Sequence, residues 1–538
     1  MEGRHYDTIV IGSGMSGLSC ASLLAQMENS RVLMIERHFT AGGYTHSFSR
    51  EGKYEWDVGI HYIGEMNPGT HYRALFDYIT GDRVQWQAMP EVYERFVYPD
   101  LSFEARAGYQ ALRNDLVQRF PHQREALQAY FRDLFAASRW YGRFMLSKLL
   151  PTYLSSLAYA LTRHGRDLAL TTTGDYLRRR FQDPQLQAVL ASQWGDVGLP
   201  PGQSAFAVHA VVVCHYLDGG YYPLGGAKQI ANAVIPIVEA QGGRVLTRHR
   251  VERIILRGDR AVGVKVRSRW QGTDRLEEFY ADRIISCAGA QTTYAQLLPK
   301  DYPLAWRRQL EHFPAGSAHV CAYVGFKESP ARLGFKGENH WIYTSYDHDD
   351  MFAHRNDLLA GKAGACFLSF ASLKDASAQG HTGQIIAFTD YAPFSAWRDK
   401  SWGKRGVDYA ALKQRMGATL IEFVDRHYPG FADLVDYCEV STPLTTENFT
   451  GHRHGWIYGL PACPAKLTAP WLGPRTPLKN LYLTGADVTG QGLVGAMMGG
   501  VLTSLVAAKN PWPVVKLLAG AMRLAKDPRQ RPVATASI

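Results

Sequence analysis

Apolar and polar positions alternate along the first 60 residues in the order of a parallel β-α-β unit. Apolar side chains fill positions 9–11 and 32–35, and small and apolar residues recur with helical spacing between 15 and 25. Two short apolar runs on either side of a helix predict parallel strands joined by a crossover. Further along, residues 243–286 alternate as a β-meander that returns to a buried strand. Residues 481–484 predict another strand, followed by a helix rich in small residues.

The turn after the first predicted strand carries glycines in the spacing GxGxxG, at Gly12, Gly14 and Gly17. Glycine lets the backbone N–H groups at the start of a helix approach the negative phosphates of a dinucleotide. Glu36 ends the second apolar run, where a carboxylate accepts hydrogen bonds from both ribose hydroxyls and disfavours a 2′-phosphate. The spacing alone is weak evidence, but a strand, a helix and a distant acid in register predict a bound dinucleotide.

A second glycine pair, Gly42-Gly43, favours FAD over NAD, because a second close backbone approach suits a dinucleotide extended along the sheet edge. Arg37 can balance the pyrophosphate, and the backbone of Val251 in the meander is expected to face the adenine. Asp487 is expected at the ribitol or phosphates, and the helix that begins near Leu493 to point its N–H groups at the flavin pyrimidine. The FAD-binding residues predicted from these patterns are Gly12, Ser13, Gly14, Ser16, Gly17, Glu36, Arg37, Gly42, Gly43, Val251, Gly485, Asp487, Leu493 and Val494.

These segments predict an α/β protein with a Rossmann-type FAD-binding lobe built from three chain segments, and a mixed α+β substrate lobe with a helical cap. The predicted FAD-binding domain comprises residues 1–70, 225–295 and 450–510. The rest divides into 71–224, the helical cap and membrane-facing part of the substrate lobe; 296–449, the substrate domain; and 511–538, a basic amphipathic tail.

The composition is that of a large globular protein, with 538 residues of which 46% are hydrophobic. Its 7 cysteines are scattered without a CxxC pair, so we expect no metal site, no disulfide framework and a reducing cytoplasmic environment. Met1 lies a few residues before the first predicted strand, which leaves no room for a cleaved signal peptide. The longest apolar run, residues 493–508, is shorter than the about 18 residues that indicate a transmembrane helix.

The net charge of +10 indicates an acidic partner. Nucleic acid is not expected, because no known binding module and no stripe of basic and aromatic residues is present. Two segments instead have the pattern of interfacial helices: residues 514–526 place Lys516, Arg523 and Lys526 opposite an apolar side, and residues 143–166 have basic ends around an apolar middle. We therefore expect peripheral binding to the inner face of an anionic membrane. Helices docked on the protein itself are the alternative.

Longer motifs extend the interpretation along nearly the whole chain. The chain resembles the all-trans-retinol 13,14-reductases, within the phytoene desaturase and carotenoid isomerase group of flavoproteins. The resemblance is carried by AGGYTHSF, DVGIHYIG, SAFAVHAVVVCHYLDGGYYPLGGAKQIA, GGRVLT and NLYLTGADVTGQGLVGAMMGG. It implies FAD as the cofactor and places Tyr44, Gly59 and Ile60 beside the flavin. Tyr44 and Thr45 stand where the animal members carry a pair of cysteines, which leaves the substrate open.

The chemistry that the resemblance implies is hydride transfer from reduced flavin to one carbon of a polyene double bond, with an acid protonating the other carbon. His61 is the first candidate for that acid and Tyr222 the second, with Tyr62 beside His61, because the family brings GIHYIG and YYPLGG close to the flavin. A histidine that only bonds the flavin or a carbonyl is the alternative. Weaker candidates are Glu65, His209 and His215. Aromatic residues expected in an apolar substrate tunnel are Phe206, Tyr216, Tyr221, Tyr222, Trp341 and Tyr343.

The implied function is saturation of a carbon–carbon double bond in a retinoid, carotenoid or similar apolar polyene, or desaturation in the reverse direction. A redox-neutral cis-trans isomerase that uses reduced FAD and a lipid-binding flavoprotein without catalysis are the alternatives. The sequence contains one nucleotide fingerprint, and FAD is expected to occupy it. NAD(P)H would therefore bind transiently elsewhere, or another reductant would replace it.

Overall fold

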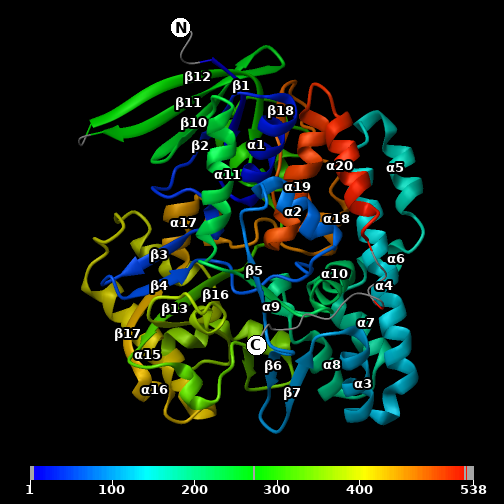
Figure 1. The fold of residues 1–538 in the computed structure, drawn as a ribbon, viewed down its shortest axis with the longest axis vertical. Helices are drawn as coiled ribbons and strands as arrows, with labels where there is room; N and C mark the ends of the chain where they lie inside the picture. Colours follow the sequence, from blue (N-terminus) through cyan, green and yellow to red (C-terminus); the bar gives the residue numbers. More distant parts are fainter. Residues whose placement is uncertain (1–4, 271–272, 526–528, 530–538) are drawn as a thin grey trace.

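Two large sheets organise the computed structural model, which describes residues 5–270, 273–525 and 529 (Figure 1). The first sheet has seven strands in the order β10-β11-β12-β1-β2-β9, with β18 paired to β12. Its strands are β1 (His5–Ile11), β2 (Val32–Ile35), β9 (Arg244–Leu246), β10 (His249–Arg257), β11 (Arg260–Trp270), β12 (Thr273–Ser286) and β18 (Leu481–Leu483). Strands from both ends of the chain thus lie in one sheet.

Strand β12 connects the two parts of this sheet. Its first part pairs antiparallel with β11 in the meander, and its last residues pair in parallel with β1 and β18. The parallel part is buried on both sides: helices cover one face, and the meander strands with loop segments such as that of Trp456 cover the other. The helices of this lobe are α1 (Met15–Glu28), α2 (His71–Thr80), α11 (Lys228–Ala240), α19 (Gly492–Ala507) and α20 (Trp512–Met522). Helix α1 packs against both α19 and α11.

The second sheet lies at the opposite end of the molecule and also has seven strands, in the order β17-β13-β16-β15-β14-β6-β7 (Figure 1). Its strands are β6 (Val92–Val97), β7 (Ser102–Arg106), β13 (Ala318–Phe326), β14 (Asn339–Tyr343), β15 (Ala365–Ser369), β16 (His381–Thr389) and β17 (Val435–Ser441). Helices α15 (Val407–His427) and α16 (Phe431–Leu434) pack on one face, where Val320, Val324 and Leu420 share a core. Side chains alternate between the faces of a strand, so the opposite face is left to line the interior of the molecule.

Helices form the cap beside this second sheet (Figure 1). They are α3 (Tyr109–Arg119), α4 (Arg124–Ser147), α5 (Ser155–Thr162), α6 (Arg166–Leu170), α7 (Thr173–Arg180), α8 (Pro184–Ala191), α9 (Trp194–Val197) and α10 (Phe206–Tyr216). Two small antiparallel sheets, β3 (Ser47–Arg50) with β4 (Tyr54–Asp57) and β5 (Trp86–Ala88) with β8 (Tyr221–Pro223), connect the lobes. The remaining helices are α12 (Ala290–Thr292), α13 (Arg307–Glu311), α14 (His348–Ala353), α17 (Pro443–Thr450) and α18 (Pro464–Thr468).

The predicted fold class is confirmed: a Rossmann-type α/β lobe draws its strands from three chain segments and meets a mixed lobe with a helical cap. The exact residue ranges of the domains stay predictions. No helix within the described residues is long and apolar enough to cross a membrane.

The C-terminal segment differs from the expected free amphipathic helix. Helix α20 buries Val514 and Ala521 in the same core as α1 and α2, so much of its apolar side is covered by protein. An apolar stripe has the same sequence pattern whether protein or lipid covers it, which explains the difference. Lys526, the last basic residue of the predicted helix, lies outside the described residues.

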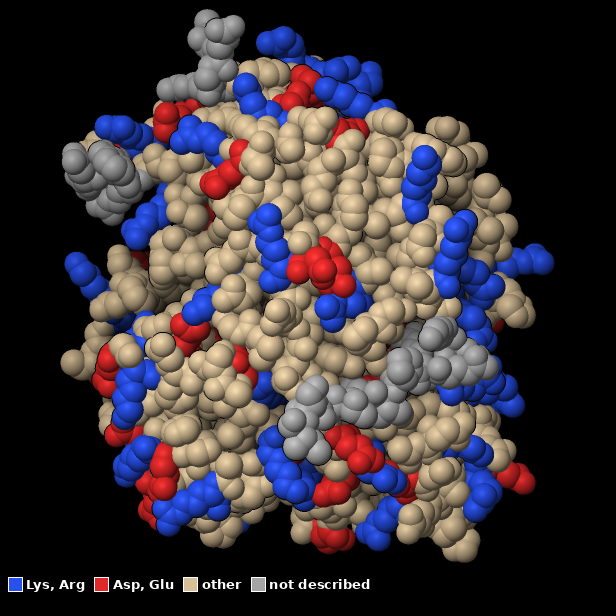
Figure 2. Space-filling model, viewed as in Figure 1, with Lys and Arg blue, Asp and Glu red and all other residues tan. Residues whose placement is uncertain are grey.

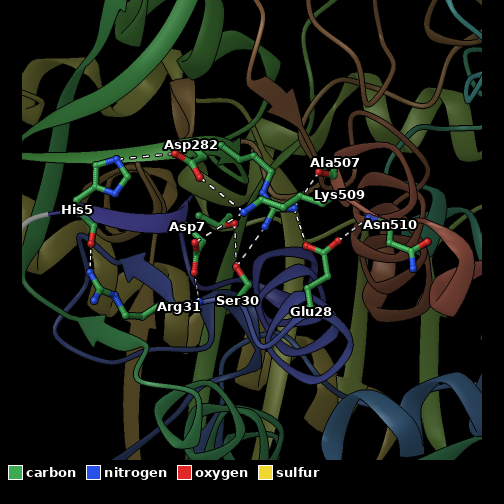
Figure 3. A network of polar contacts seen from close by, with 11 residues as sticks. His5, Asp7, Glu28, Ser30, Arg31, Asp282, Ala507, Lys509 and Asn510 are labelled. Atoms are coloured by element: carbon green, nitrogen blue, oxygen red, sulfur yellow. Dashed lines mark hydrogen bonds and ion pairs between the residues drawn. The ribbon is translucent and has the colours of Figure 1, made fainter.

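A polar network fixes this C-terminal segment to the first sheet (Figure 3). The guanidinium of Arg283, 5% exposed, donates to Glu28 at 2.7 Å and to the carbonyl of Ala507 at 3.0 Å. The other carboxylate oxygen of Glu28 accepts from the backbone N–H of Asn510 at 3.0 Å. A buried ion pair needs such additional hydrogen bonds to offset the loss of water. The end of α19 is therefore tied to β12 and α1 by charge as well as by packing.

We predict that Gly17→Ala destabilises the first lobe. A Cβ at Gly17 would lie 2.3 Å from the carbonyl oxygen of Gly12, so the turn or the helix would have to move. Overpacking of this kind costs about 1–3 kcal/mol. Thermal unfolding should show a lower midpoint. Gly142→Ala is the matched control: this helical glycine in α4 has open space around it, and the change should leave stability equal or higher by up to about 1 kcal/mol. Equal midpoints for the two variants would contradict the close contact at Gly17.

Candidate active site

A cavity of about 520 Å³ brings the predicted dinucleotide motifs together with the inner face of the second sheet. One part is lined by the glycine turn after β1, by the acid after β2 and by the start of α19. The other part is lined by aromatic and aliphatic side chains from β14, β15, β16, α9 and α14. The two parts belong to one continuous cavity, so a ligand in the first part can meet a ligand in the second.

Glu36 organises the dinucleotide part. One of its carboxylate oxygens accepts from the backbone N–H of Ser13 at 2.9 Å and from its hydroxyl at 2.8 Å, and the other accepts from the N–H of His38 at 2.7 Å. The Ser13 hydroxyl in turn accepts from the N–H of Gly42 at 3.0 Å. A carboxylate has about four acceptor positions, so three protein donors leave room for one further hydroxyl. Glu36 therefore positions both glycine turns and keeps limited capacity for a ribose.

The two glycine turns touch. A Cβ at Gly43 would lie 2.8 Å from the Cα of Gly14, so a side chain cannot be added without separating the turns. On the flavin side, a Cβ at Gly59 would lie 3.0 Å from that of Tyr44, which shows that these segments also meet. The carboxylate of Asp487 accepts from the N–H groups of Ala290 and Leu460, each at 2.7 Å. These contacts hold the walls of an extended backbone-lined groove.

Most of the predicted FAD-binding residues line this cavity. They are Gly12, Gly14, Ser16, Glu36, Arg37, Gly43, Tyr44, Gly59, Ile60, Val251, Gly485, Asp487 and Leu493. Ser13, Gly17, Gly42 and Val494 lie behind the lining, where Ser13 and Gly42 hold the turns in place. The donor set of backbone N–H groups at the start of α1 and α19, with an acid at the ribose position, fits an FAD-type dinucleotide.

The second part of the cavity is apolar and aromatic. Trp341 and Tyr343 project from β14, two positions apart and thus on one face of the strand, and Phe367 projects from β15. The ring centroids of Trp341 and Phe367 are 4.6 Å apart. Further lining side chains are Trp194, Met351, Phe352, Leu358, Ile386 and Phe388. This surface suits an extended apolar ligand that offers few hydrogen-bonding groups.

The predicted tunnel residues divide between cavity and core. Trp341 and Tyr343 line the cavity, whereas Phe206, Tyr216, Tyr221 and Tyr222 do not. Phe206 stacks on Tyr176 with centroids 3.9 Å apart, and Tyr216 stacks on Tyr62 at 4.2 Å. Their sequence neighbours are equally apolar, so only the fold distinguishes lining from core.

Of the predicted proton donors, His61 lines the cavity and Tyr222 does not. Burial, followed by the charge of Lys374, lowers the pKa of His61 to about 3, so its imidazole is neutral at pH 7. The Tyr222 hydroxyl donates to Asp57 below the cavity, and the tyrosine is 3% exposed. This placement does not support a direct role for Tyr222. The weaker candidates also have structural partners: His209 is bonded to Tyr130 at 2.9 Å and His215 to Glu65 at 3.1 Å.

Tyr62 leads to a buried carboxyl pair that the sequence motifs do not indicate. Its hydroxyl donates to Asp196 at 2.6 Å, and Asp196 lines the cavity from α9. Glu94 on β6 is fully buried and accepts from Trp341 Nε1 at 3.0 Å, while its other oxygen has no hydrogen-bond partner in the described part of the chain. Burial raises the pKa of Asp196 to about 7, and burial together with repulsion by Asp196 raises that of Glu94 to about 8. One proton is thus held beside the cavity at neutral pH.

The pair lies near the start of α19, which lines the dinucleotide part of the cavity. Helix α9 contacts the start of α19, where the side chain of Gln491 donates to the carbonyl of Val197 at 3.2 Å. Tyr458, another lining residue, interacts electrostatically with both Asp196 and Tyr44. Asp196 and Glu94 come from a short helix and from strand β6, neither of which carries a motif, and no local signal could have identified them.

We predict that Glu36→Ala loses FAD. Each hydrogen bond to a charged group contributes about 1.5–3 kcal/mol, and the variant loses the contacts that hold both glycine turns as well as any ribose bond. Flavin content after purification and the Kd from reconstitution should show the loss. Glu278→Ala, on β12 of the same sheet and outside the cavity lining, is the control that should keep FAD. Full flavin content in Glu36→Ala would contradict the placement of the ribose.

Comparison with known proteins agrees with this geometry. Residues 10–79 match the family described as NAD(P)-binding Rossmann-like domain, and residues 207–299 match GMC oxidoreductase. Cyclohexylamine oxidase of Brevibacterium oxydans has the same fold: its structure aligns with a TM-score of 0.58 at 15% identity, covering 96% of this chain and 100% of that one.

Two relatives in sequence are more specific. Prolycopene isomerase 2 of an Oncidium hybrid is 25% identical over 520 residues, which cover 93% of this chain and 83% of that protein. An all-trans-retinol 13,14-reductase of Danio rerio is 32% identical over 519 residues, which cover 92% of this chain and 84% of that protein. The resemblance seen in the motifs is confirmed, and the chain belongs to the all-trans-retinol 13,14-reductase family.

Proposed function

We propose that this protein is an FAD-dependent oxidoreductase that acts on a carbon–carbon double bond of an apolar polyene, by saturating it. The observation that carries the proposal is the continuity of one cavity: its backbone-lined part fits a dinucleotide and its aromatic part fits a long apolar chain. Relatives named for retinol and prolycopene support a retinoid- or carotenoid-like substrate. When bound, reduced FAD supplies a hydride equivalent.

The residues of the chain perform the remaining tasks. Trp341, Tyr343 and Phe367 hold an extended apolar substrate against the flavin side and exclude water from it. An isolated double bond has no carbonyl to polarise, so the second carbon needs a proton from a well-placed acid. His61 remains a candidate because it lines the cavity, but its neutral imidazole is a weak acid. Asp196 is the better donor, because it lines the same cavity and holds a proton near pH 7.

In this assignment Tyr62 and Glu94 are positioning residues. The Tyr62 hydroxyl orients Asp196 through their 2.6 Å hydrogen bond, and Glu94 positions the ring of Trp341 by accepting from its Nε1 at 3.0 Å. Burial, rather than a charge on Glu94, raises the pKa of Asp196. The other titratable groups that interact with the pair are Tyr93, Tyr216, Tyr343, Tyr458 and Lys374.

A redox-neutral isomerase is the second candidate function, and the prolycopene isomerase relative favours it. Cavity and cofactor site would serve both reactions, and desaturation is the saturation reaction in reverse. For the reductase, NAD(P)H is the proposed transient electron donor.

Peripheral membrane binding is proposed for residues 146–161 rather than for the C-terminal tail. Large apolar side chains are exposed there: Leu146 by 58%, Tyr153 by 83%, Leu157 by 49%, Tyr159 by 58% and Leu161 by 48%. The flanking stretch from 134 to 166 contains no acidic residue. Figure 2 shows Lys and Arg side chains and hardly any acidic ones on the side of the molecule where Figure 1 places α5. An apolar patch with a basic surround suits an anionic lipid surface, from which a polyene would come.

The product of a single turnover tests the proposed function. Dithionite-reduced protein mixed anaerobically with all-trans-retinol or a carotenoid should reoxidise its flavin and yield a product heavier by two hydrogens, measured by mass spectrometry. An unchanged mass with altered double-bond geometry would instead identify the isomerase. Failure of every polyene either to reoxidise the flavin or to change its double-bond geometry would refute both functions and favour a lipid-binding flavoprotein.

The proton donor is tested by Asp196→Asn, which should retain FAD and slow polyene-driven flavin reoxidation by about 10²–10⁴. In the wild type the rate should fall as pH rises through about 7, because Asp196 then loses its proton, and this fall should vanish in the variant. His61→Gln should keep the same pH profile if Asp196 is the donor. Asp133→Asn is the matched control, since Asp133 also accepts from a tyrosine hydroxyl, that of Tyr176 at 2.8 Å, but lies outside the cavity lining.

The opposite pattern, a wild-type rate in Asp196→Asn with a large loss in His61→Gln, would assign the proton to His61. A second readout does not depend on turnover. The folded state binds more protons than the unfolded state between the ordinary pKa of a glutamate and the raised value of Glu94, so wild-type stability should decrease with rising pH across that window. Glu94→Gln should make this decrease smaller in urea unfolding, and the raised pKa of Asp196 should account for part of what remains.

Membrane binding is tested with Leu157→Asp/Leu161→Asp. Cosedimentation with vesicles containing anionic lipid should fall in this variant, because charge replaces the exposed apolar contact, and wild-type binding should weaken with salt. Val407→Asp is the control: Val407 is 82% exposed in the second lobe and far from this segment in sequence. Equal binding of both variants would exclude residues 146–161 as the contact.

A further inference from the structure

A second pocket, of about 290 Å³, adjoins the ribose end of the dinucleotide cavity and is strongly basic. It shares Arg37, Arg250, Gln296 and Gly451 with the cavity lining. Its charged lining residues are Arg37, Arg250, Arg398, Lys400, Arg405 and Arg453, with Asp399 and Glu447 as the acids. Six positive and two negative side chains leave a surplus of four positive charges. Because these residues come from distant parts of the chain, folding alone creates the concentration of charge.

Arg405 is the strongest indication of an anion-binding site. It is 6% exposed, and its Nε has no hydrogen-bond partner in the part of the chain that the structure describes. Its guanidinium reaches the carbonyl of Leu444 at 3.4 Å and lies 5.3 Å from the ring of Tyr409, neither of which carries a negative charge. A buried guanidinium is costly unless acceptors or a negative charge satisfy it. The Nε–H group of Arg405 is thus a buried donor without an acceptor among the described residues.

The acids of the pocket do not supply that acceptor. Glu447 is engaged by the Tyr391 hydroxyl at 2.5 Å and stands 3.5 Å from Arg398. Arg37 donates to the carbonyl of Asn448 at 2.9 Å, and burial together with the charge of Arg250 lowers its pKa. The positive side chains therefore repel one another, and an anion between them would relieve that repulsion.

FAD in the neighbouring cavity does not reach most of these side chains. Arg398, Lys400, Arg405 and Arg453 line the basic pocket but not the dinucleotide cavity. The expected place of the FAD pyrophosphate is the start of α1, at the glycine turn. One guanidinium group can bind two phosphate oxygens at once, and several converging arginines are typical of sites for phosphate esters. We propose that this pocket is a second anion site, which binds the phosphate groups of a nucleotide or other phosphate ester beside bound FAD.

The inference rests on the proposed function only in placing FAD in the adjoining cavity. A phosphorylated reductant such as NADPH would find its phosphates held there. The chemistry is shared by free phosphate, so inorganic phosphate and nucleotides are separate arms of the test.

Calorimetric titration of the oxidised FAD-loaded protein with inorganic phosphate, 2′,5′-ADP, NADPH and NADH tests the site. We expect binding of at least 2′,5′-ADP or inorganic phosphate, weakened by salt, since the attraction is electrostatic. Arg405→Gln should weaken it by about tenfold or more, as expected for a charged hydrogen bond. Lys400→Gln/Arg453→Gln changes two exposed residues and tests the same pocket if Arg405→Gln does not fold. Arg332→Gln, an exposed arginine paired with Glu328, is the control that should bind normally.

Tighter binding of 2′,5′-ADP than of phosphate would identify a nucleotide as the ligand, and equal binding would identify the phosphate group itself; both support the site. Absence of binding by every probe at low salt, or unchanged binding in both pocket variants, would overturn it. Loss of FAD from a folded Arg405→Gln protein would also overturn it, because the pocket would then serve the FAD phosphates. No polyene is present in the titration, so its failure is distinct from a failure of the double-bond reaction.

Discussion

The carboxylate of Glu36 is the contact on which the dinucleotide half of the cavity depends. It fixes Ser13 in the first glycine turn, and the Ser13 hydroxyl fixes Gly42 in the second. Because both turns are held in this way, Gly43 packs directly against Gly14. The chain then continues through β3 and β4 to the segment that crosses the flavin side, so the position of His61 follows from the same anchor. Glu36, the acid expected to bind a ribose, thus also holds the two glycine turns of the protein in place.

The sequence allowed prediction of those structural elements and site residues that a short stretch of neighbouring residues specifies. A strand, a glycine turn, a helix and an acid stand within the first 36 residues, and they occur in the structure where their spacing places them. The carboxyl pair could not be predicted, because Glu94 and Asp196 lie in separate elements that only the packing of β6, β14 and α9 brings together. Helix α20 shows another limit of prediction from sequence. Its apolar stripe is evident in the sequence, but the sequence pattern does not indicate that Val514 packs against protein rather than lipid. Lining aromatics and core aromatics were likewise indistinguishable before folding.

The second sheet explains how one lobe can be rigid and still present a large apolar surface. Residues such as Val320 and Val324 on one face belong to a core with α15, whereas His319, Trp341 and Phe388 on the other face line the cavity. The apolar half of the cavity therefore has a floor of paired strands, and α9 of the cap packs against this floor, where Trp194 stacks on Phe388. Few polar groups enter this region, so the identity of a proton donor is restricted to a small set of side chains.

The placement of α19 has a consequence for how the protein folds during its synthesis. This helix packs on α1, and its start forms one end of the cofactor site, although about 480 residues separate the two in sequence. During synthesis the first glycine turn leaves the ribosome long before α19 exists, and the side of α1 that packs on α19 has no cover until residues 492–507 have emerged. A complete cofactor site therefore exists only after α19 has been synthesised. Binding of a cofactor there would require that these two distant segments have already met.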